Sequence, residues 1–296
     1  MASQSLQKPA EPALLSLTFD NLGEAADLER GLWPERKALG EHFSVVEVLP
    51  RLLDVLDELG LRATFFVEGL NAELYPEALA EIAAHGHELG LHAWRHEEWA
   101  GLGEREEVEL LDRGTAALAG LGHRPRGFRP PGGGLTARTA GLLRERGFAY
   151  ASPAGRAPAR TDGLALLPFE WGLVDAWFHF PKAGGLRAQL VGEAPAKNPP
   201  LPPAVKSGFF RTAVRLGSIK GARRMRTRML EAVASLPRAG GHRALLFHPF
   251  LLGWEHTLDA LRDVLTEAAR LAELGQLWAG PMGEAAERVE IEGDAS

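Results

Sequence analysis

The residues whose types and spacing could do chemistry begin with two histidines, His92 and His96, which follow the apolar run 89–91. If the chain turns helical after His92, residues four apart lie on the same face. Two neutral imidazoles side by side are a common beginning of a zinc site. The same spacing also occurs on solvated turns. A metal site is therefore expected only if other parts of the chain supply a third ligand, an acid and a base.

Other polar residues with chemical potential follow apolar runs in the same way. Asp20 and Asn21 come after the run 13–19, and Arg129 enters the turn Pro130-Pro-Gly-Gly-Gly134. Asp175 and His248 end later apolar segments. Enzymes built on barrels or open sheets carry their chemistry at the carboxyl ends of strands. A polar group that interrupts a buried pattern must be hydrogen-bonded or functional. We therefore predict that these residues share one site with the histidine pair.

The elements that must position these residues alternate along the chain. Apolar runs predict strands near 13–19, 62–67, 88–94, 126–129, 148–152, 164–169, 243–247 and 276–278. Helical spacing predicts helices over 45–59, 76–85, 104–119, 137–146 and 257–274. Strand and helix alternate about seven times, which favours an α/β fold, either a parallel barrel or a doubly wound sheet. We predict one domain over 13–285, between a disordered tail at 1–12 and a second tail at 286–296.

Composition excludes several classes of protein. The chain has 296 residues, of which 45% are hydrophobic, and a net charge of −6, so overall charge does not favour nucleic-acid binding. It has no cysteine, which excludes disulfides and thiolate metal ligands. The N-terminus shows no apolar core of a signal peptide, and no stretch approaches the roughly 20 apolar residues of a membrane span. We expect a cytoplasmic protein without a transmembrane segment. The sequence leaves its oligomeric state open.

The alternation is interrupted at 183–221, a proline-rich and then basic stretch that we interpret as an insertion or lid. Between Glu193 and Glu231 there is no acidic residue, but nine basic ones occur. These are Lys197, Lys206, Arg211, Arg215, Lys220, Arg223, Arg224, Arg226 and Arg228. A solvated helix face is the simpler interpretation. The alternative is that Arg211, Arg215, Arg223 and Arg224 attract an anionic substrate or a phospholipid surface.

Four short motifs, taken in order, resemble a known family. Thr18-Phe-Asp-Asn21, His92-x-x-x-His96, Arg129-Pro-Pro-Gly132 and Leu246-Phe-His248 are similar to the motif series of the NodB-like polysaccharide deacetylases, over roughly residues 13–285. The resemblance implies a distorted (β/α) barrel of about seven strands. It also implies a divalent metal, usually zinc, and hydrolysis of an N-acetyl group from an amino sugar. Trp171-x-x-x-Asp175 and the His248-Pro249 context also resemble the branch that includes allantoinase-like amide hydrolases.

The resemblance and ordinary amide chemistry together suggest a role for each residue. Asp20 would be the general base and His248 the general acid. Arg129 would orient Asp20, and Asp175 would hold His248 in its useful tautomer. A metal ion would be bound by Asn21, His92 and His96. Substrate-binding positions are expected at Pro130, Trp171 and Leu246, with Leu246 forming a wall of the acyl pocket.

Asn21 departs from the family pattern, which has a second aspartate there as a metal ligand. An amide oxygen can coordinate a metal but carries no charge. Three interpretations stay open: Asn21 binds the metal weakly, Glu24 or Asp27 replaces it, or the histidines bind substrate without a metal. At the level of function, we expect a metal-dependent deacetylase. The alternatives are a metal-independent amidase of the allantoinase-like type and a catalytically silent relative that binds carbohydrate.

Overall fold

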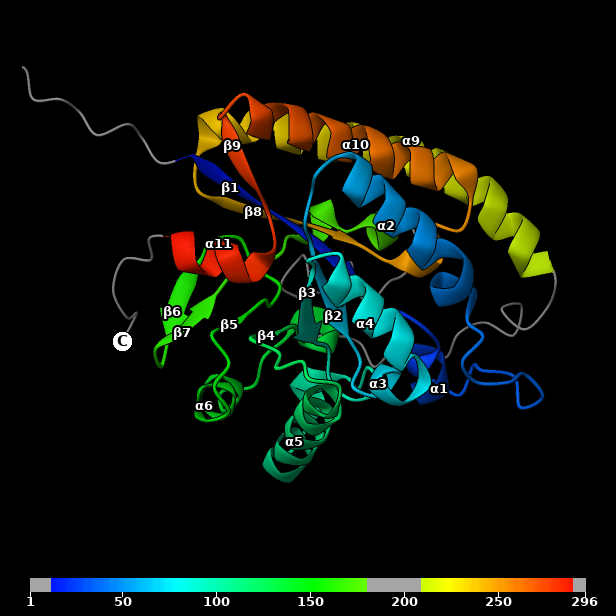
Figure 1. Cartoon of the computed structure of the whole chain (residues 1–296), viewed down its shortest axis with the longest axis vertical. Coiled ribbons are helices and arrows are strands. Elements are labelled where there is room, and N and C mark those ends of the chain that lie inside the picture. Colours follow the sequence, from blue (N-terminus) through cyan, green and yellow to red (C-terminus); the bar gives the residue numbers. More distant parts are fainter. Residues whose placement is uncertain (1–11, 180–208, 290–296) are drawn as a thin grey trace, which may run out of the picture.

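A curled sheet of nine strands forms the centre of the molecule. The computed structural model describes residues 12–179 and 209–289 (Figure 1). The strands are β1 (Ala13–Asp20), β2 (Thr64–Val67), β3 (Glu88–Leu91), β4 (Gly127–Phe128), β5 (Tyr150–Ala151), β6 (Ala159–Thr161), β7 (Leu164–Leu166), β8 (His242–Phe247) and β9 (Leu277–Gly280). Each predicted strand is present, although β2, β3, β4, β5 and β7 are shorter than the apolar runs suggested.

The strand order makes the sheet a distorted barrel. The order is β6-β7-β5-β4-β3-β2-β1-β8, and β9 pairs with β1. Among the strands of the described residues, only β6 pairs antiparallel. A single parallel bridge between Val174 and Leu246 joins the segment after β7 to β8, at the opposite end of the strand order. Apart from β6 and the extra partner β9, seven parallel strands form the barrel wall. The predicted barrel of about seven strands is confirmed.

Helices cover the outside of this wall (Figure 1). The predicted ones are α2 (Leu49–Glu58), α4 (Pro76–Ala84), α5 (Glu104–Gly120), α6 (Thr139–Glu145) and α10 (Glu255–Glu273). The structure adds α1 (Ala25–Glu29), α3 (Asn71–Leu74), α7 (Asp175–His179), α9 (Phe209–Ala239) and α11 (Met282–Arg288). Short helical turns are η1 (Ser44–Val48), η2 (Trp99–Gly101), η3 (Pro131–Gly133), η4 (Trp171–Leu173) and η6 (Pro249–Leu251). None of the helices among the described residues is long and apolar enough to cross a membrane.

The basic segment is only partly described. Helix α9 begins inside the stretch 183–221 and packs against α10 and α7. Residues 180–208 lie outside the described residues, as do 1–11 and 290–296. Helix α11 extends to Arg288, past the predicted domain end at 285. The domain limits and the insertion stay predictions.

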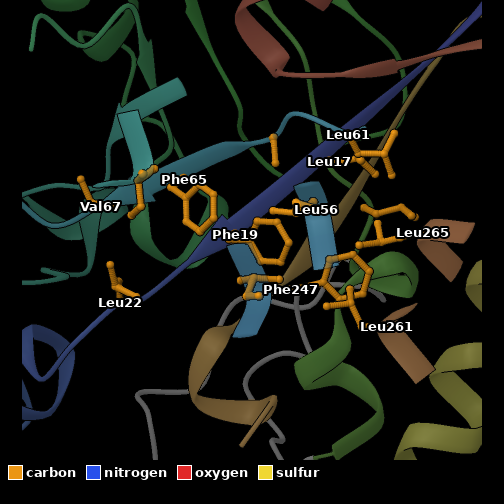
Figure 2. Packing of buried hydrophobic residues seen from close by; sticks show 14 of the residues in the cluster. Leu17, Phe19, Leu22, Leu56, Leu61, Phe65, Val67, Phe247, Leu261 and Leu265 are labelled. Carbon is orange, nitrogen blue, oxygen red and sulfur yellow. The ribbon is translucent and has the colours of Figure 1, made fainter. Parts of the chain in front are cut away.

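Strand residues divide between two faces of the barrel wall. One face is apolar and packs under α2 and α10, as Figure 2 shows for Phe19, Phe65 and Phe247 beside Leu56 and Leu261. The Phe19 ring stacks on Phe65 with centroids 4.9 Å apart and lies 5.7 Å from Phe247. Successive side chains of a strand point to opposite faces. This outer layer therefore uses every second residue and holds the main hydrophobic core.

The remaining residues point into the barrel, where a smaller cluster includes Phe66, Tyr150, Leu246 and Met282. Parallel pairing aligns Thr18 with Thr64 on one side and with Leu246 on the other. The hydroxyl of Thr18 donates to the carbonyl of Leu245 at 2.7 Å. Small and polar residues are therefore common on the inner face. This alternation decides which residues reach the end of the barrel.

Candidate active site

Five polar side chains converge at the carboxyl ends of the barrel strands. Asp20 is the last residue of β1, while Glu68, His92, Arg129 and His248 each follow a strand by one residue. All five continue the inward-facing set, and all are buried. Asp20 acts electrostatically on both His92 and His248: burial lowers the pKa of His92 and the charge of Asp20 only opposes that shift, while the same charge adds to the raised pKa of His248, which places the three groups near one another. The predicted gathering of polar groups at strand ends is thus present.

Asp20 is held by Arg129. Nη1 of Arg129 donates to Oδ1 of Asp20 at 2.7 Å and to the hydroxyl of Thr18 at 2.9 Å. Nη2 donates to the hydroxyl of Ser152 at 2.9 Å. The guanidinium lies 4.2 Å from the centroid of the Phe66 ring, so its position is set on several sides. One Asp20 oxygen is therefore fixed, which leaves the other to accept a proton. This geometry fits the orienting role expected of Arg129.

His248 and Asp175 form a buried pair. Asp175 begins α7 and is fully buried. Nδ1 of His248 donates to Oδ1 of Asp175 at 2.6 Å, and the backbone N–H of His248 donates to Oδ2 at 2.7 Å. Burial by itself would lower the pKa of His248, but the charge and hydrogen bond of Asp175 outweigh it and raise that pKa. His248 is therefore stabilised in its protonated form, as a general acid requires.

The two histidines of the candidate metal site lie together. Their ring centroids are 5.0 Å apart and the rings are nearly perpendicular. Nδ1 of His92 donates to the carbonyl of Arg129 at 2.8 Å, which leaves Nε2 with a lone pair for a metal. Burial lowers the pKa of His92 to about 4, and burial followed by the nearness of His92 lowers that of His96. Both rings are neutral at pH 7, which is the form that binds metals.

Asn21 has an unused acceptor at the position where the family pattern expects a ligand. Its side chain is 7% exposed, and Oδ1 is buried without a hydrogen-bond partner. A buried oxygen without a donor costs free energy unless a cation or water meets it. The backbone of Asn21 is left-handed, with φ of 58°. Asparagine tolerates this conformation better than most residues. Asn21 and His92 therefore each leave an acceptor atom free for a metal.

His96 fits a metal only after one contact changes. Nη2 of the exposed Arg30 donates to Nδ1 of His96 at 3.3 Å. Metal-bound histidines usually donate their second nitrogen to an acceptor, whereas this nitrogen faces a donor and a positive charge. While Nδ1 accepts this hydrogen bond, the proton of the neutral His96 ring is on Nε2, and neither nitrogen has a free lone pair. Arg30 must therefore move away before His96 can bind a metal. Among residues 12–179 and 209–289, no three His, Asp or Glu side chains form a group that could hold a metal ion.

Glu24 and Asp27, the suggested replacements for residue 21, are used elsewhere. Glu24 accepts the backbone N–H of Gly40 at 2.7 Å and the hydroxyl of Tyr75. Asp27 lies 3.9 Å from the His42 ring. The interpretation in which one of these acids completes the histidine site is not supported by this geometry.

The residues expected to bind substrate lie on the segments that carry His248, Arg129 and Asp175. Leu246 is buried on the inner face, two residues before His248 on β8. Pro130 is buried at the start of the turn after Arg129. Trp171, partly buried in η4, packs edge-on against Phe169 at 5.1 Å. Their contact with substrate stays a prediction.

The described part of the basic segment lies on the outer surface of α9. Arg223 and Arg224 are exposed and line a groove with Trp177 and Phe178 of α7. Arg226 pairs with Asp263 of α10. The side chains of Arg211 and Arg215 lie outside the described residues. Attraction of an anionic substrate to this segment stays a prediction.

Backbone strain is concentrated at the site. Among the described residues, the non-glycine residues with positive φ are Asn21 at 58°, Ala93 at 60°, His96 at 75° and Asp162 at 47°. Three of these four belong to the Asn21 turn and the histidine loop. Such conformations persist where surrounding contacts hold them, and they are frequent at functional sites. The strain supports a site at this end of the barrel independently of the side chains.

Comparison with known proteins agrees with this geometry. Residues 7–151 match the family model of polysaccharide deacetylases. Chitin deacetylase 1 of Saccharomyces cerevisiae is 35% identical over 95 residues, which cover 32% of this chain and 32% of that protein. A putative polysaccharide deacetylase of Mycobacterium smegmatis superposes with a TM-score of 0.72 at 25% identity, covering 98% of this chain and 94% of that one. Puue allantoinase has a TM-score of 0.62 at 17% identity, covering 95% and 91%, and shows the shared fold alone.

Over residues 7–151, just under half of its length, the chain is similar to the polysaccharide deacetylases, a family of deacetylase enzymes. The resemblance read from the four motifs is thereby confirmed. The chain aligns with about a third of the length of the curated relatives that it matches. Its own activity and substrate are therefore matters for proposal.

Glu68 is the site residue that the sequence interpretation missed. It ends the apolar run of β2 in the same way that Asp20 ends the run of β1. The same signal, an acid directly after a buried strand, could have identified it. The predicted strand 62–67 stopped one residue short, and the inward alternation of β2 became apparent only from its pairing with β1.

Proposed function

We propose that this protein hydrolyses an amide bond, by deacetylation of an N-acetylated amino sugar. The observation that supports this most directly is that a candidate base and a candidate acid lie at the ends of two adjacent strands. Asp20 on β1 pairs with Arg129, and the charge and hydrogen bond of Asp175 outweigh burial and raise the pKa of His248 after β8. A base and an acid held separately are what hydrolysis of an unreactive amide requires.

Each residue has a defined part in the reaction. Asp20 takes a proton from the attacking water, whose oxygen forms a bond to the acetyl carbon. His248 donates its proton to the sugar nitrogen as the C–N bond breaks, so that acetate and a free amine are released. Arg129 and Asp175 hold the two groups in place. A divalent metal bound by His92, His96 and Asn21 would polarise the acyl carbonyl and acidify the water.

A second candidate is metal-independent amide hydrolysis. The observation in its favour is Arg30, a cation whose Nη2 already contacts His96. An arginine at this position could stabilise a developing negative charge on the acyl oxygen. Asn21, which contributes no charge, is compatible with either mechanism.

The test is acetate release from N-acetylated oligosaccharides by protein treated with chelator and then supplied with zinc, cobalt, manganese or no metal. Activity that depends on added metal supports the first mechanism, and undiminished activity of chelated protein supports the second. An Asp20→Asn variant should lose nearly all turnover under both. Glycan binding by the unaltered protein without turnover on a broad amide panel would contradict both and favour the silent carbohydrate-binding alternative.

A further inference from the structure

The solvent-facing side of α9 carries charges that neither the barrel nor the proposed chemistry uses. From Phe209 to Ala239 the helix contains eight basic residues and a single acid, Glu231. The side of the helix that includes Met225 is buried in the core. Lys220, Arg224 and Arg228 are four residues apart and exposed, so they form a row on the solvent-facing side.

A groove lies beside this row, between α9 and α7. Its volume is about 480 Å³. Arg223, Arg224 and Arg228 line one wall, and Trp177 and Phe178 line the other. Guanidinium groups bind phosphate oxygens through paired N–H donors, and aromatic side chains offer an apolar surface beside them. The groove can therefore contact the charged and the apolar part of one ligand at the same time.

The arginines of the groove have no acidic partner within the described part of the chain. Arg226, on the side of α9 that faces α10, pairs with Asp263. Within 12–179 and 209–289, no salt bridge involves Arg223, Arg224 or Arg228. The sequence contains no acid at all between positions 193 and 231. Neighbouring positive charges repel one another, so an external anion would stabilise this face.

The length of the basic face favours an extended anionic surface over a single small anion. Lys220 lies before the groove and Arg238 lies after it, and both are exposed. At about 1.5 Å per residue, these two positions are about 27 Å apart along the helix. Ile219, which is 39% exposed, adds an apolar side chain next to Lys220. Figure 1 shows α9 at the edge of the molecule beside α10, where it can meet such a surface.

We propose that the solvent-facing side of α9 and its groove dock the protein on a membrane surface that contains acidic phospholipids. A lipid phosphate enters the groove beside Arg223, Arg224 and Arg228, and Trp177 contacts the apolar part of the same lipid. Clusters of about four to eight basic residues on a helix are typical of proteins that bind anionic lipids. Each basic residue near the surface strengthens such binding about fivefold. Docking requires no turnover, so this inference does not rest on the proposed function.

The experiment measures sedimentation of the full chain with vesicles of phosphatidylcholine, with and without phosphatidylglycerol. We expect binding only to vesicles that contain phosphatidylglycerol, and weaker binding at higher salt, because salt screens the charges. A variant with Arg223→Gln, Arg224→Gln and Arg228→Gln should bind about 100-fold more weakly, since three contributions of about fivefold multiply. Its melting temperature should stay unchanged, because the replaced side chains are exposed.

A matched control removes three positive charges elsewhere on the surface. Arg105, Arg124 and Arg156 are exposed and lie outside α9. The variant in which these three are glutamine has the same net charge as the groove variant. It should bind the acidic vesicles about as strongly as the unaltered protein.

The outcomes are distinct from those of the deacetylation assay, since none depends on acetate release. Weakening confined to the groove variant supports docking through α9. Equal weakening in both triple variants shows that overall charge alone matters and overturns the inference. Failure of the unaltered protein to bind acidic vesicles, or equal binding to phosphatidylcholine alone, also overturns it. Calorimetric binding of glycerol 3-phosphate that the groove variant loses, without vesicle binding, assigns the groove to a soluble phosphate ester and overturns membrane docking.

Discussion

Replacement of Asp175 by asparagine should shift the pH range over which the protein works. Oδ1 of Asp175 accepts the Nδ1 proton of His248 at 2.6 Å in a fully buried position. At an effective dielectric constant near 20, opposite charges about 4 Å apart attract by about 4 kcal/mol. At about 1.4 kcal/mol per pKa unit, this corresponds to an upper limit of about 3 units. We expect Asp175→Asn to lower the pKa of His248 by about 1 to 3 units.

The assay is the pH dependence of kcat/KM for acetate release. A general acid must be protonated, so activity falls as pH rises through the pKa of His248. A lowered pKa moves this basic limb to lower pH, and a shift of about 1 to 3 units leaves up to about 10³-fold less of the acid form near pH 8, with an equal loss of kcat/KM. Asp175 accepts hydrogen bonds from three donors, Nδ1 and the backbone N–H of His248 and the backbone N–H of Ala176. Asparagine turns an N–H toward at least one of these donors, which costs about 1–3 kcal/mol of stability.

Asp57 offers a matched control. Its Oδ2 lies 2.7 Å from Nδ1 of His85, so the surface carries a second His–Asp pair of similar length. That pair is exposed and is worth at most about 1 kcal/mol. Asp57→Asn should leave the pH profile unchanged. If Asp175→Asn also retains the basic limb at its original pH, the assignment of His248 as the acid is refuted.

Three further outcomes are expected. Arg129→Met should lower the free energy of unfolding, measured by chemical denaturation, by about 3–5 kcal/mol, because it leaves Asp20 buried and unpaired. A double variant that also carries Asp20→Asn should recover part of this loss. If the effects of the two substitutions are fully additive, the ion-pair explanation is contradicted. Arg30→Ala should raise zinc affinity measured by calorimetry, since a competing positive charge leaves His96, and unchanged affinity would show that Arg30 does not oppose the metal. Burial lowers the pKa of His87 to about 4, below its unfolded value near 6.5. Between these two values the unfolded state binds more protons than the folded state. The free energy of unfolding should therefore fall as pH drops from 7 to 5, by up to about 2 kcal/mol from this residue. A His87→Gln variant should flatten that part of the stability curve, and an unchanged slope would rule out His87 as its source.

The barrel could be predicted from the sequence because each strand is an apolar run ending in a turn or a polar residue. Helix α9 could not be recognised because its basic residues suggested an insertion. Yet it buries Ala222, Met225, Met229 and Val233, which recur at helical spacing. That pattern was present in the sequence but was obscured by charged residues on the exposed side. The nine basic residues between Glu193 and Glu231 outnumber these four apolar positions and hide their helical spacing.

The candidate site was predictable where chemistry follows directly from chain position. Asp20, Arg129, Asp175 and His248 were expected to interact in pairs, and the structure shows both pairs hydrogen-bonded. The contact of Arg30 with His96 could not be foreseen, because it joins a loop and a turn separated by 66 positions. Contacts of this kind depend on how loops fold over the barrel rather than on any periodic pattern.

The division of the barrel wall into two faces has a consequence for how such a protein can change over time. The apolar outer layer holds the fold, while the reactive groups occupy alternate positions of the same strands. A substitution on the inner face therefore leaves the packing beneath α2 and α10 intact. A scaffold arranged in this way tolerates replacement of its reactive residues and can acquire a new specificity by single substitutions.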